Sequence, residues 1–517
     1  MTETEKSLVA DVIIVGGGSA GSLLAARLSE QAGRDVLLIE AGGEPSDPDI
    51  WKPAAWPALQ GRNYDWDYVT EPQAGTAGRS HHWARGRLIG GSSCLHAMGY
   101  MRGHPADFDA WVEATGDNRW SWEGLLPAFM AIENHPLGGD GVHGKGGPMP
   151  VYLPDEEVSP LARAFIEAGA ALGLPRLTGH NSGQMIGVTA NSLNIRNGKR
   201  VTAADAWLTA DVRQRANLTI LTGSRVHRLL FDGDHVQGID IASPDGEIRA
   251  TGNEIILCAG AIETPALLMR SGVGPSEVLR AAGVECRIDM AEIGRNLQDH
   301  LLGAGNLYAS RRNVPPSRLQ HSESMSYMRA SDFSASGQPE IVVGCGVAPI
   351  VSERFAAPEA GTAYSLLFGV THPTSRGTIR ISGPAPSDRL SIDPAYLQTE
   401  HDRAMFRNAL AAAREIGGHN ELSDWRASEL LPGRMDSATD IDGFIAEAAI
   451  THHHPSGTCR MGSDEGAVVD ANLRLKTLHN LHIVDASVIP RLTSGPIHAA
   501  VLAIAETFAR RFESART

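Results

Sequence analysis

The 517-residue chain lacks several features that define particular classes of protein. Its five cysteines are scattered without a CxxC pair or a metal-binding spacing, which favours reduced thiols in a cytosolic enzyme. The formal net charge of -15 disfavours a nucleic-acid partner, because phosphates would be repelled. No apolar run is long enough to span a bilayer, and residues 1–10 lack the basic start and apolar core of a signal peptide. We therefore expect a cytoplasmic protein with no membrane partner.

Residues 11–40 predict two strands that flank one helix. The apolar, β-branched run at 12–15 predicts a buried strand, and the Ala- and Leu-rich stretch at 22–28 predicts a helix. A second apolar run at 36–39 predicts a second strand, and residues 16–21 match the pattern GxGxxG. This context favours a dinucleotide site over an ordinary glycine-rich turn, although it does not separate NAD from FAD.

Each position of the GxGxxG pattern has a physical reason. Gly16 allows a tight turn, Gly18 lets the backbone approach a pyrophosphate, and Gly21 lets the helix pack closely on the strand. The first N–H groups of the helix are free to bind the anion. Glu40, at the end of the second strand, lies where a carboxylate would accept hydrogen bonds from a ribose diol.

Further motifs follow along the chain. Gly-Gly-Ser-Ser at 90–93 predicts a tight bend that can lie against a large planar or anionic ligand, and 260–274 predicts a second glycine-to-helix transition, with the helix starting near Thr264-Pro265. We also expect one helical stretch over 106–132. The remaining motifs are RNLQDH at 295–300, HPSGTCRMG at 454–462, VDASVIP at 484–490 and SGPIHAAVLAIAE at 494–506.

Taken together and in this order, these motifs resemble the glucose-methanol-choline (GMC) family of FAD-dependent oxidoreductases, and the resemblance covers nearly the whole chain. It implies an α/β plus α+β fold. A discontinuous, Rossmann-like FAD-binding domain would comprise residues 8–100, 196–300 and 445–517. A substrate-binding domain, built on an antiparallel sheet with helices, would comprise residues 101–195 and 301–444.

The resemblance also implies which residues bind FAD. The GxGxxG turn and Glu40 would hold the ADP half, the backbone of Val226 would lie near the adenine, and residues 485–486 would close over the ribityl chain. The expected cofactor-binding residues are Gly16, Gly18, Ser19, Ala20, Gly21, Glu40, Ala41, Arg87, Gly90, Gly91, Ser92, Cys94, Leu95, His96, Ala97, Val226, Asp485, Ala486, His498 and Ala499.

Two departures from the family pattern concern the flavin. His96 stands where the family often has Asn, and Leu95 stands where some members carry a flavin-linking histidine. A leucine cannot form that bond, so we expect non-covalent FAD. The alternative is a link through Cys94 or His96.

Three consecutive histidines at 452–454 are the sharpest chemical feature. No Asp, Glu or Cys lies at a companion spacing, so we expect no metal. Alcohol oxidation needs a base for the hydroxyl proton while hydride leaves the adjacent carbon for the flavin, and neutral imidazole suits this task. The resemblance implies that His454 faces the flavin and that His498 is its polar partner. We expect His454 to be the base, His498 to orient the hydroxyl or share its proton, and His452 to point to the same side of an extended segment.

The substrate prediction rests on a smaller signal. Pro496 stands in a place often taken by Asn, and together with His452-x-His454 it resembles family members that oxidise pyridoxine. This implies a pyridine primary alcohol oxidised to an aldehyde, with O2 or another electron acceptor as the second substrate. His452, His454, Pro496 and His498 are the expected substrate contacts.

Other readings stay open at this point. Aryl alcohols and hydroxymethylfurfural are credible substrates. Choline is disfavoured by an aromatic content of only 5%, which is poor material for a cation-binding cage, although Glu340 could supply a carboxylate. A non-redox hydroxynitrile lyase and a two-domain NAD-linked dehydrogenase are alternatives from other classes.

Overall fold

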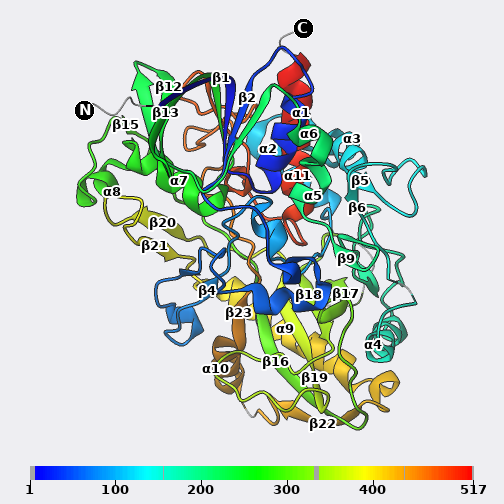
Figure 1. Ribbon diagram of the computed structural model, residues 1–517. Coiled ribbons are helices and arrows are strands. Elements are labelled where there is room, and N and C mark those ends of the chain that lie inside the picture. The colour runs from blue at the N-terminus through cyan, green and yellow to red at the C-terminus, as the bar shows by residue number, and fades with distance from the viewer. Residues whose placement is uncertain (1–5, 155, 331–332, 334–336, 436, 515–517) are drawn as a thin grey trace.

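A computed structural model describes residues 6–154, 156–330, 333, 337–435 and 437–514. Two large β-sheets lie at opposite ends of the molecule (Figure 1). Strand β1 (Lys6–Val15) begins and helix α11 (His498–Ser514) ends at the same end, beside the first sheet. The first and last parts of the chain thus lie at the same end of the molecule.

The first sheet is mostly parallel. Strand β1 lies at its centre, between β2 and β13, and the path through the sheet is β10-β2-β1-β13-β12-β11. Strand β24 pairs with β13 in parallel, whereas β12 and β11 extend the sheet antiparallel. The other strands are β2 (Val36–Ile39), β10 (Leu218–Leu221), β11 (Arg225–Asp232), β12 (His235–Ser243), β13 (Gly246–Leu257) and β24 (Leu481–Ile483). The buried apolar runs at 12–15 and 36–39 are strands, as predicted.

Helix α1 (Ser19–Leu28) begins directly after the turn that ends β1. Gly16 makes this turn with φ +105°, in the region that favours glycine. A Cβ added to Gly21 would lie 1.8 Å from the Gly16 carbonyl oxygen, so only glycine lets the helix start this close to the strand. Helix α11 packs beside α1.

Helix α7 (Gly260–Arg270) begins one turn earlier than predicted. The Asp485 carboxylate accepts hydrogen bonds from the Gly260 N–H (2.9 Å) and the Thr264 hydroxyl (2.6 Å), which stabilises the additional first turn. Pro265 therefore lies inside the helix and leaves the Ala261 carbonyl without its helical donor. The Thr458 hydroxyl donates to that carbonyl at 2.7 Å instead.

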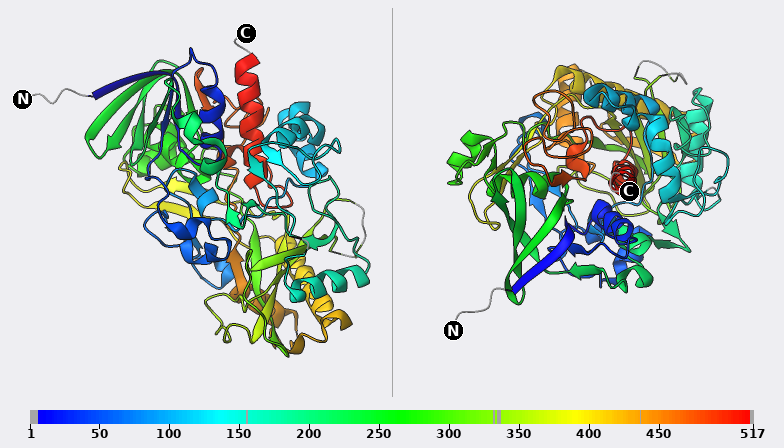
Figure 2. Two further views of the ribbon diagram at one scale, coloured as in Figure 1. Left: turned by 45° about the vertical axis from the view of Figure 1, so that its right-hand side comes forward. Right: turned by 90° about the horizontal axis from the view of Figure 1, so that it is seen from above.

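The second sheet is antiparallel and has helices packed on it, as expected (Figure 2). Its path is β22-β16-β19-β18-β17-β7, and β23 pairs with β16. Its strands are β7 (Gly187–Ala190), β16 (Leu301–Ser310), β17 (Ser322–Met328), β18 (Ile341–Gly346), β19 (Ala363–Val370), β22 (Arg426–Leu431) and β23 (Ala449–Thr451). The helices packed on it are α4 (Pro160–Ala171), α9 (Glu400–Gly418) and α10 (Ala438–Ala448).

The helical stretch expected over 106–132 is two helices, α2 (Pro105–Thr115) and α3 (Trp122–Ile132). Gly116 ends the first in a left-handed conformation (φ +69°), and the Ser121 side chain caps the second. The remaining elements are short: β3 (Tyr68–Val69), β4 (His82–Trp83), β5 (Glu133–Asn134), β6 (Met149–Pro150), β8 (Ile195–Arg196), β9 (Lys199–Arg200), α5 (Ala203–Trp207), α6 (Ala210–Arg213), β14 (Val273–Gly274), α8 (Ser276–Ala281), β15 (Ile288–Asp289), β20 (Thr378–Ile381) and β21 (Leu390–Asp393).

Within the described ranges, none of the helices combines the length and the apolar character that a bilayer crossing requires.

The contact of Gly21 with the β1 turn gives a stability prediction. Gly21→Ala should lower the thermal unfolding midpoint, because the new methyl group forces helix and strand apart at a cost of about 1–3 kcal/mol or more. Gly33→Ala is the matched control, since a Cβ there meets nothing within 4 Å. Scanning calorimetry would contradict this packing if both variants had the same unfolding midpoint as the wild-type protein.

Candidate active site

A cavity of about 1080 Å³ is lined by residues from both sheets. Most of the expected cofactor-binding residues line it: Gly16, Gly18, Ser19, Ala20, Glu40, Ala41, Gly91, Ser92, Leu95, His96, Ala97, Val226, Asp485, Ala486 and His498. His452, His454 and Pro496 line it as well. Sequence motifs nearly 500 residues apart therefore meet around one space.

Five of the expected residues lie outside this lining: Gly21, Arg87, Gly90, Cys94 and Ala499. Gly90 donates its N–H to the Gly17 carbonyl (2.8 Å), and the Cys94 thiol faces the Ile89 carbonyl (3.4 Å). Gly90 and Cys94 are themselves adjacent in sequence to lining residues.

The GxGxxG turn and the bend at 90–93 face each other across one end of the cavity. A Cβ on Gly91 would lie 2.7 Å from the Gly18 Cα, whereas a Cβ on Gly18 would meet nothing closer than the Gly91 Cα at 3.9 Å. Gly18 thus presents bare backbone to open space at the start of α1, which suits the approach of a pyrophosphate.

Glu40 is buried behind the same turn. Its two carboxylate oxygens accept hydrogen bonds from the N–H groups of Gly17 (2.8 Å) and Gly42 (2.9 Å). Burial raises the pKa of Glu40 to about 7, against the lowering effect of these bonds. A carboxylate has about four lone-pair directions, so Glu40 can still accept from a ribose hydroxyl.

The three histidines line the same cavity. His453 has φ +62°, so the segment is not the extended one that was expected. The rings of His452 and His454 nevertheless come together, with centroids 4.4 Å apart. Asp299 holds this turn, because its carboxylate accepts from the His454 N–H (2.6 Å) and the Thr451 hydroxyl (2.7 Å).

His300, the last residue of RNLQDH, contacts the expected base. Its Nδ1 lies 2.9 Å from Nδ1 of His454, and its Nε2 lies 2.8 Å from the Thr371 carbonyl oxygen. Among the described residues, no hydrogen-bond partner is found for Nε2 of His454, which lines the cavity. Neither His300 nor Asp299 was identified from the sequence, although both lie in a motif that was singled out.

Burial keeps these imidazoles neutral. It lowers the pKa of His300 to about 4 and that of His452 to about 3, with the proximity of His300 adding to the effect on His452. Burial, followed by the proximity of His452 and His300, holds the pKa of His454 well below its usual value. A neutral ring is the form that can accept a proton.

His498 and His96 form a second pair of rings, with centroids 4.8 Å apart. His96 Nδ1 accepts from the Met98 N–H (3.0 Å) and lies 3.1 Å from Nη1 of Arg200, so its proton is on Nε2. His498 Nδ1 lies 3.3 Å from the Ser19 hydroxyl. In the described part of the chain, Nε2 of each ring is buried without a hydrogen-bond partner.

These two orphaned nitrogens test whether the cavity fits FAD. A buried polar atom without a partner is costly, and the flavin ring carries both donors and acceptors at its edge. The glycine-lined turn and the buried acid therefore match the phosphate and ribose parts of FAD, and the free Nε2 of His96 matches a group at the edge of its ring. The residues present fit the cofactor.

An apolar wall that the sequence did not predict completes the cavity. It consists of Met101, Leu302, Met325, Ile350, Leu367 and Ile450, which belong to one hydrophobic cluster. Across the described ranges, no group of three His, Cys, Asp or Glu residues is arranged to hold a metal ion.

Comparison with known proteins identifies the family. Residues 10–302 match the N-terminal model of the GMC oxidoreductases and residues 373–505 match the C-terminal model. The chain belongs to the GMC oxidoreductase family. It is an FAD-dependent enzyme that oxidises alcohols at a CH–OH group.

Individual relatives are similar over nearly the whole chain. A pyridoxine 4-oxidase from Microbacterium luteolum is 68% identical over 97% of this chain and 99% of its own. The crystal structure of pyridoxine 4-oxidase from Mesorbium loti has a TM-score of 0.97 and 73% identity, covering 98% of this chain and 99% of that one. An oxygen-dependent choline dehydrogenase from Pseudomonas savastanoi pv. phaseolicola is 35% identical over 96% of this chain and 92% of its own.

The lowered pKa of His454 predicts the pH dependence of this GMC oxidoreductase. Because the base stays unprotonated below the usual imidazole pKa of about 6.5, the acid limb of kcat/KM should lie below that pH. If kcat/KM, measured from pH 5 to 9, fell to half of its maximum on the acid side at or above pH 6.5, the lowered pKa of His454 would be contradicted. Flavin absorbance at each pH controls for loss of FAD, since Glu40 also titrates in this range.

Proposed function

We propose that this enzyme oxidises the primary alcohol at position 4 of pyridoxine to the aldehyde, with O2 as the electron acceptor. The similarity carries the proposal: identity to two pyridoxine 4-oxidases is 68% and 73%, against 35% to a choline dehydrogenase. The expected substrate contacts His452, His454, Pro496 and His498 all line the cavity, which supports the same substrate.

The turn at 16–21, Glu40, Val226, the bend at 90–93 and residues 485–486 would hold FAD. When bound there, FAD would supply the acceptor for the hydride of the carbinol carbon and a route for the two electrons to O2, which would leave as hydrogen peroxide.

His454 would take the hydroxyl proton of the substrate on its open Nε2. His498, at the start of α11, would hold the hydroxyl from the other side through its own free Nε2. His452 lies against His454 and would close the pocket around the alcohol. Desolvation of the three rings in the cavity wall lowers their pKa values and keeps them unprotonated until the substrate supplies a proton.

The apolar wall supports a flat heteroaromatic substrate. Met101 and Met325 offer thioethers that adapt to a ring, and the aliphatic residues beside them would cover its face. Glu340, the carboxylate considered for choline, is not in the cavity lining and accepts from Arg329 and the Ala330 N–H. This arrangement favours pyridoxine over choline.

Non-covalent FAD is part of the proposal. Leu95 has no nucleophile, and the Nδ1 of His96 is occupied by its hydrogen bonds to Met98 and Arg200. Cys94 lies outside the cavity lining, and burial raises the pKa of its thiol to about 12, so it is not a thiolate.

The division into an FAD-binding domain (8–100, 196–300, 445–517) and a substrate-binding domain (101–195, 301–444) belongs to the same proposal. The expected cytoplasmic location stays a prediction.

Replacing the proposed base tests the assignment. His454→Ala should slow flavin reduction by at least about a hundredfold, because the proton then has no acceptor. Anaerobic stopped-flow measurement follows this step alone, and reduction at the wild-type rate would eliminate His454 as the base. His479→Ala is the control, since His479 is exposed and pairs only with Asp234 at the surface.

A substrate panel tests the proposed reaction. Among pyridoxine, benzyl alcohol, hydroxymethylfurfural and choline, pyridoxine should bleach the flavin under anaerobic conditions at least about tenfold faster, because a loss of 1.4 kcal/mol in transition-state fit corresponds to tenfold in rate. Air should then restore the colour with formation of hydrogen peroxide. Fastest bleaching by choline would overturn the substrate, and slow return of colour in air would overturn O2 as the acceptor.

The mode of FAD attachment has its own test. Precipitation with acid should release all yellow colour into the supernatant, because Leu95 carries no nucleophile and the Cys94 thiol lies outside the cavity lining. Flavin that stays in the protein pellet, and moves with a peptide containing Cys94 or His96 after proteolysis, would contradict non-covalent binding.

A further inference from the structure

We infer that His300 is a positioning residue that fixes the tautomer of His454, so that Nε2 of His454 is left bare to take the substrate proton. This inference rests on the proposed role of His454 as the base. It assigns a task to the last residue of RNLQDH, which lies immediately before β16 and is not part of the cavity lining.

The protons in this pair can be counted. The Thr371 carbonyl is only an acceptor, so His300 must donate to it from Nε2 (2.8 Å). A neutral imidazole carries one N–H, which leaves Nδ1 of His300 as an acceptor. The 2.9 Å contact between the two Nδ1 atoms then requires the proton of His454. His454 has no second proton while it is neutral, so its Nε2 carries a lone pair.

A protonated His300 would reverse the result. It would donate from both nitrogens, and His454 would then keep its single proton on Nε2, where it could not act as a base. Burial makes this state costly: it lowers the pKa of His300 to about 4. The neutral chain from Thr371 through His300 to His454 is the state that the site favours.

The Thr371 carbonyl is itself held in place. The Thr371 N–H donates to the Glu340 carbonyl (3.1 Å), and its hydroxyl donates to the Pro339 carbonyl (2.7 Å). The next residue, His372, reaches back to the Thr371 hydroxyl with Nδ1 (2.9 Å) and lies 2.9 Å from Asp107 Oδ1 with Nε2. The acceptor that orients His300 is therefore part of a rigid network.

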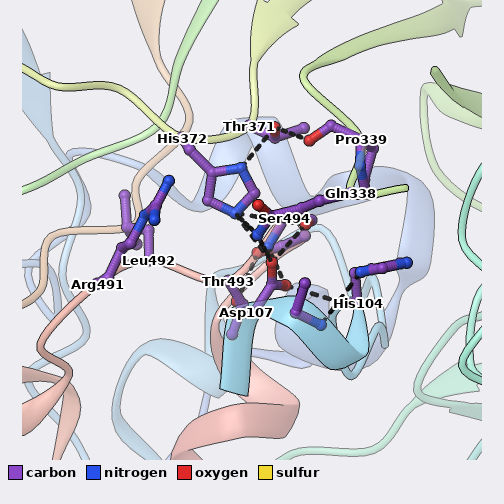
Figure 3. A network of polar contacts seen from close by, with 12 residues as sticks. His104, Asp107, Gln338, Pro339, Thr371, His372, Arg491, Leu492, Thr493 and Ser494 are labelled. Atoms are coloured by element: carbon purple, nitrogen blue, oxygen red, sulfur yellow. Dashed lines mark hydrogen bonds and ion pairs between the residues drawn. The ribbon is translucent and has the colours of Figure 1, made fainter. Parts of the chain in front are cut away.

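Asp107 joins this network to the other catalytic segment. Figure 3 shows His372 between Thr371 and the Asp107 carboxylate, with Ser494 and Gln338 around the same group. The Ser494 N–H and hydroxyl both donate to it, at 2.6 and 2.8 Å. Ser494 begins the loop that carries Pro496 and His498 into the cavity, so one buried carboxylate steadies the surroundings of both histidines.

Three substitutions at position 300, to Leu, Asp and Asn, test this inference. The three side chains have nearly the same shape and differ in the hydrogen bond that they offer to Nδ1 of His454. Asp can only accept and therefore reproduces the bare Nδ1 of His300, Leu offers nothing, and Asn can either accept or donate. We expect His300→Leu to slow anaerobic flavin reduction by pyridoxine at least about a hundredfold, since a mis-set tautomer in a comparable relay costs up to about 10⁴.

His300→Asp should reduce its flavin at least about tenfold faster than His300→Leu, because it restores the acceptor. Its acid limb should move to higher pH than that of the wild type, because a carboxylate stabilises the imidazolium form of His454. His300→Asn should fall between the two. Equal rates and equal pH profiles for the three holoenzymes would show that only the bulk of the side chain matters, and would overturn the inference.

The outcome separates this inference from the proposed function. If His454→Gln reduces its flavin at the wild-type rate, the base assignment fails. If His454→Gln is slow while the three His300 variants behave alike, only the role of His300 fails.

A measurement on the wild-type holoenzyme does not depend on the variants folding. In wild-type protein labelled with ¹⁵N at the histidine rings, the couplings of the His454 nitrogens to the carbon-bound ring protons should identify Nδ1 as the protonated nitrogen and Nε2 as the bare one. Assignment of the bare resonance to Nδ1 would overturn the inference.

Discussion

The 2.9 Å contact between the Nδ1 atoms of His300 and His454 determines what the catalytic end of the cavity can do. In water, two neutral imidazoles would exchange protons with the solvent and populate both tautomers. Here the His300 ring is buried and the His454 ring is half-buried in the cavity wall. Desolvation keeps both rings neutral, so each carries one proton and each hydrogen bond fixes the next. This series of hydrogen bonds begins at the Thr371 backbone carbonyl, which cannot titrate. The direction of the hydrogen bonds is thereby set by the fold.

The two sheets supply complementary parts of the site. Strands β16 and β23 pair at Leu301 and Thr451, which places His300 and the three histidines side by side, and Asp299 ties the turn between them. The parallel sheet brings the glycine-rich turn and the Asp485 loop into the lining of the same cavity. The proposed cofactor contacts thus come largely from the parallel sheet and the loops around it, and the surroundings of the proposed base come from the second sheet. The proposed alcohol site lies where they meet.

Features encoded locally could be predicted from the sequence. The strands at 12–15 and 36–39, the role of Gly21 and the meeting of the motifs around one cavity follow from short patterns with clear physical reasons. The start of α7 was wrong because Asp485 and Thr458, about 200 residues away, stabilise its first turns. His452 and His454 do share a side, but through a left-handed His453 held by Asp299 rather than an extended strand. His300 and the apolar wall could not be predicted, since their positions depend on the register of the second sheet.

Neutron diffraction from deuterium-exchanged crystals of the FAD-loaded enzyme would locate the protons directly. We expect deuterium on Nε2 of His300 and on Nδ1 of His454, with none on Nε2 of His454. Deuterium on Nε2 of His454, with a bare Nδ1 facing a doubly protonated His300, would contradict the role given to this pair.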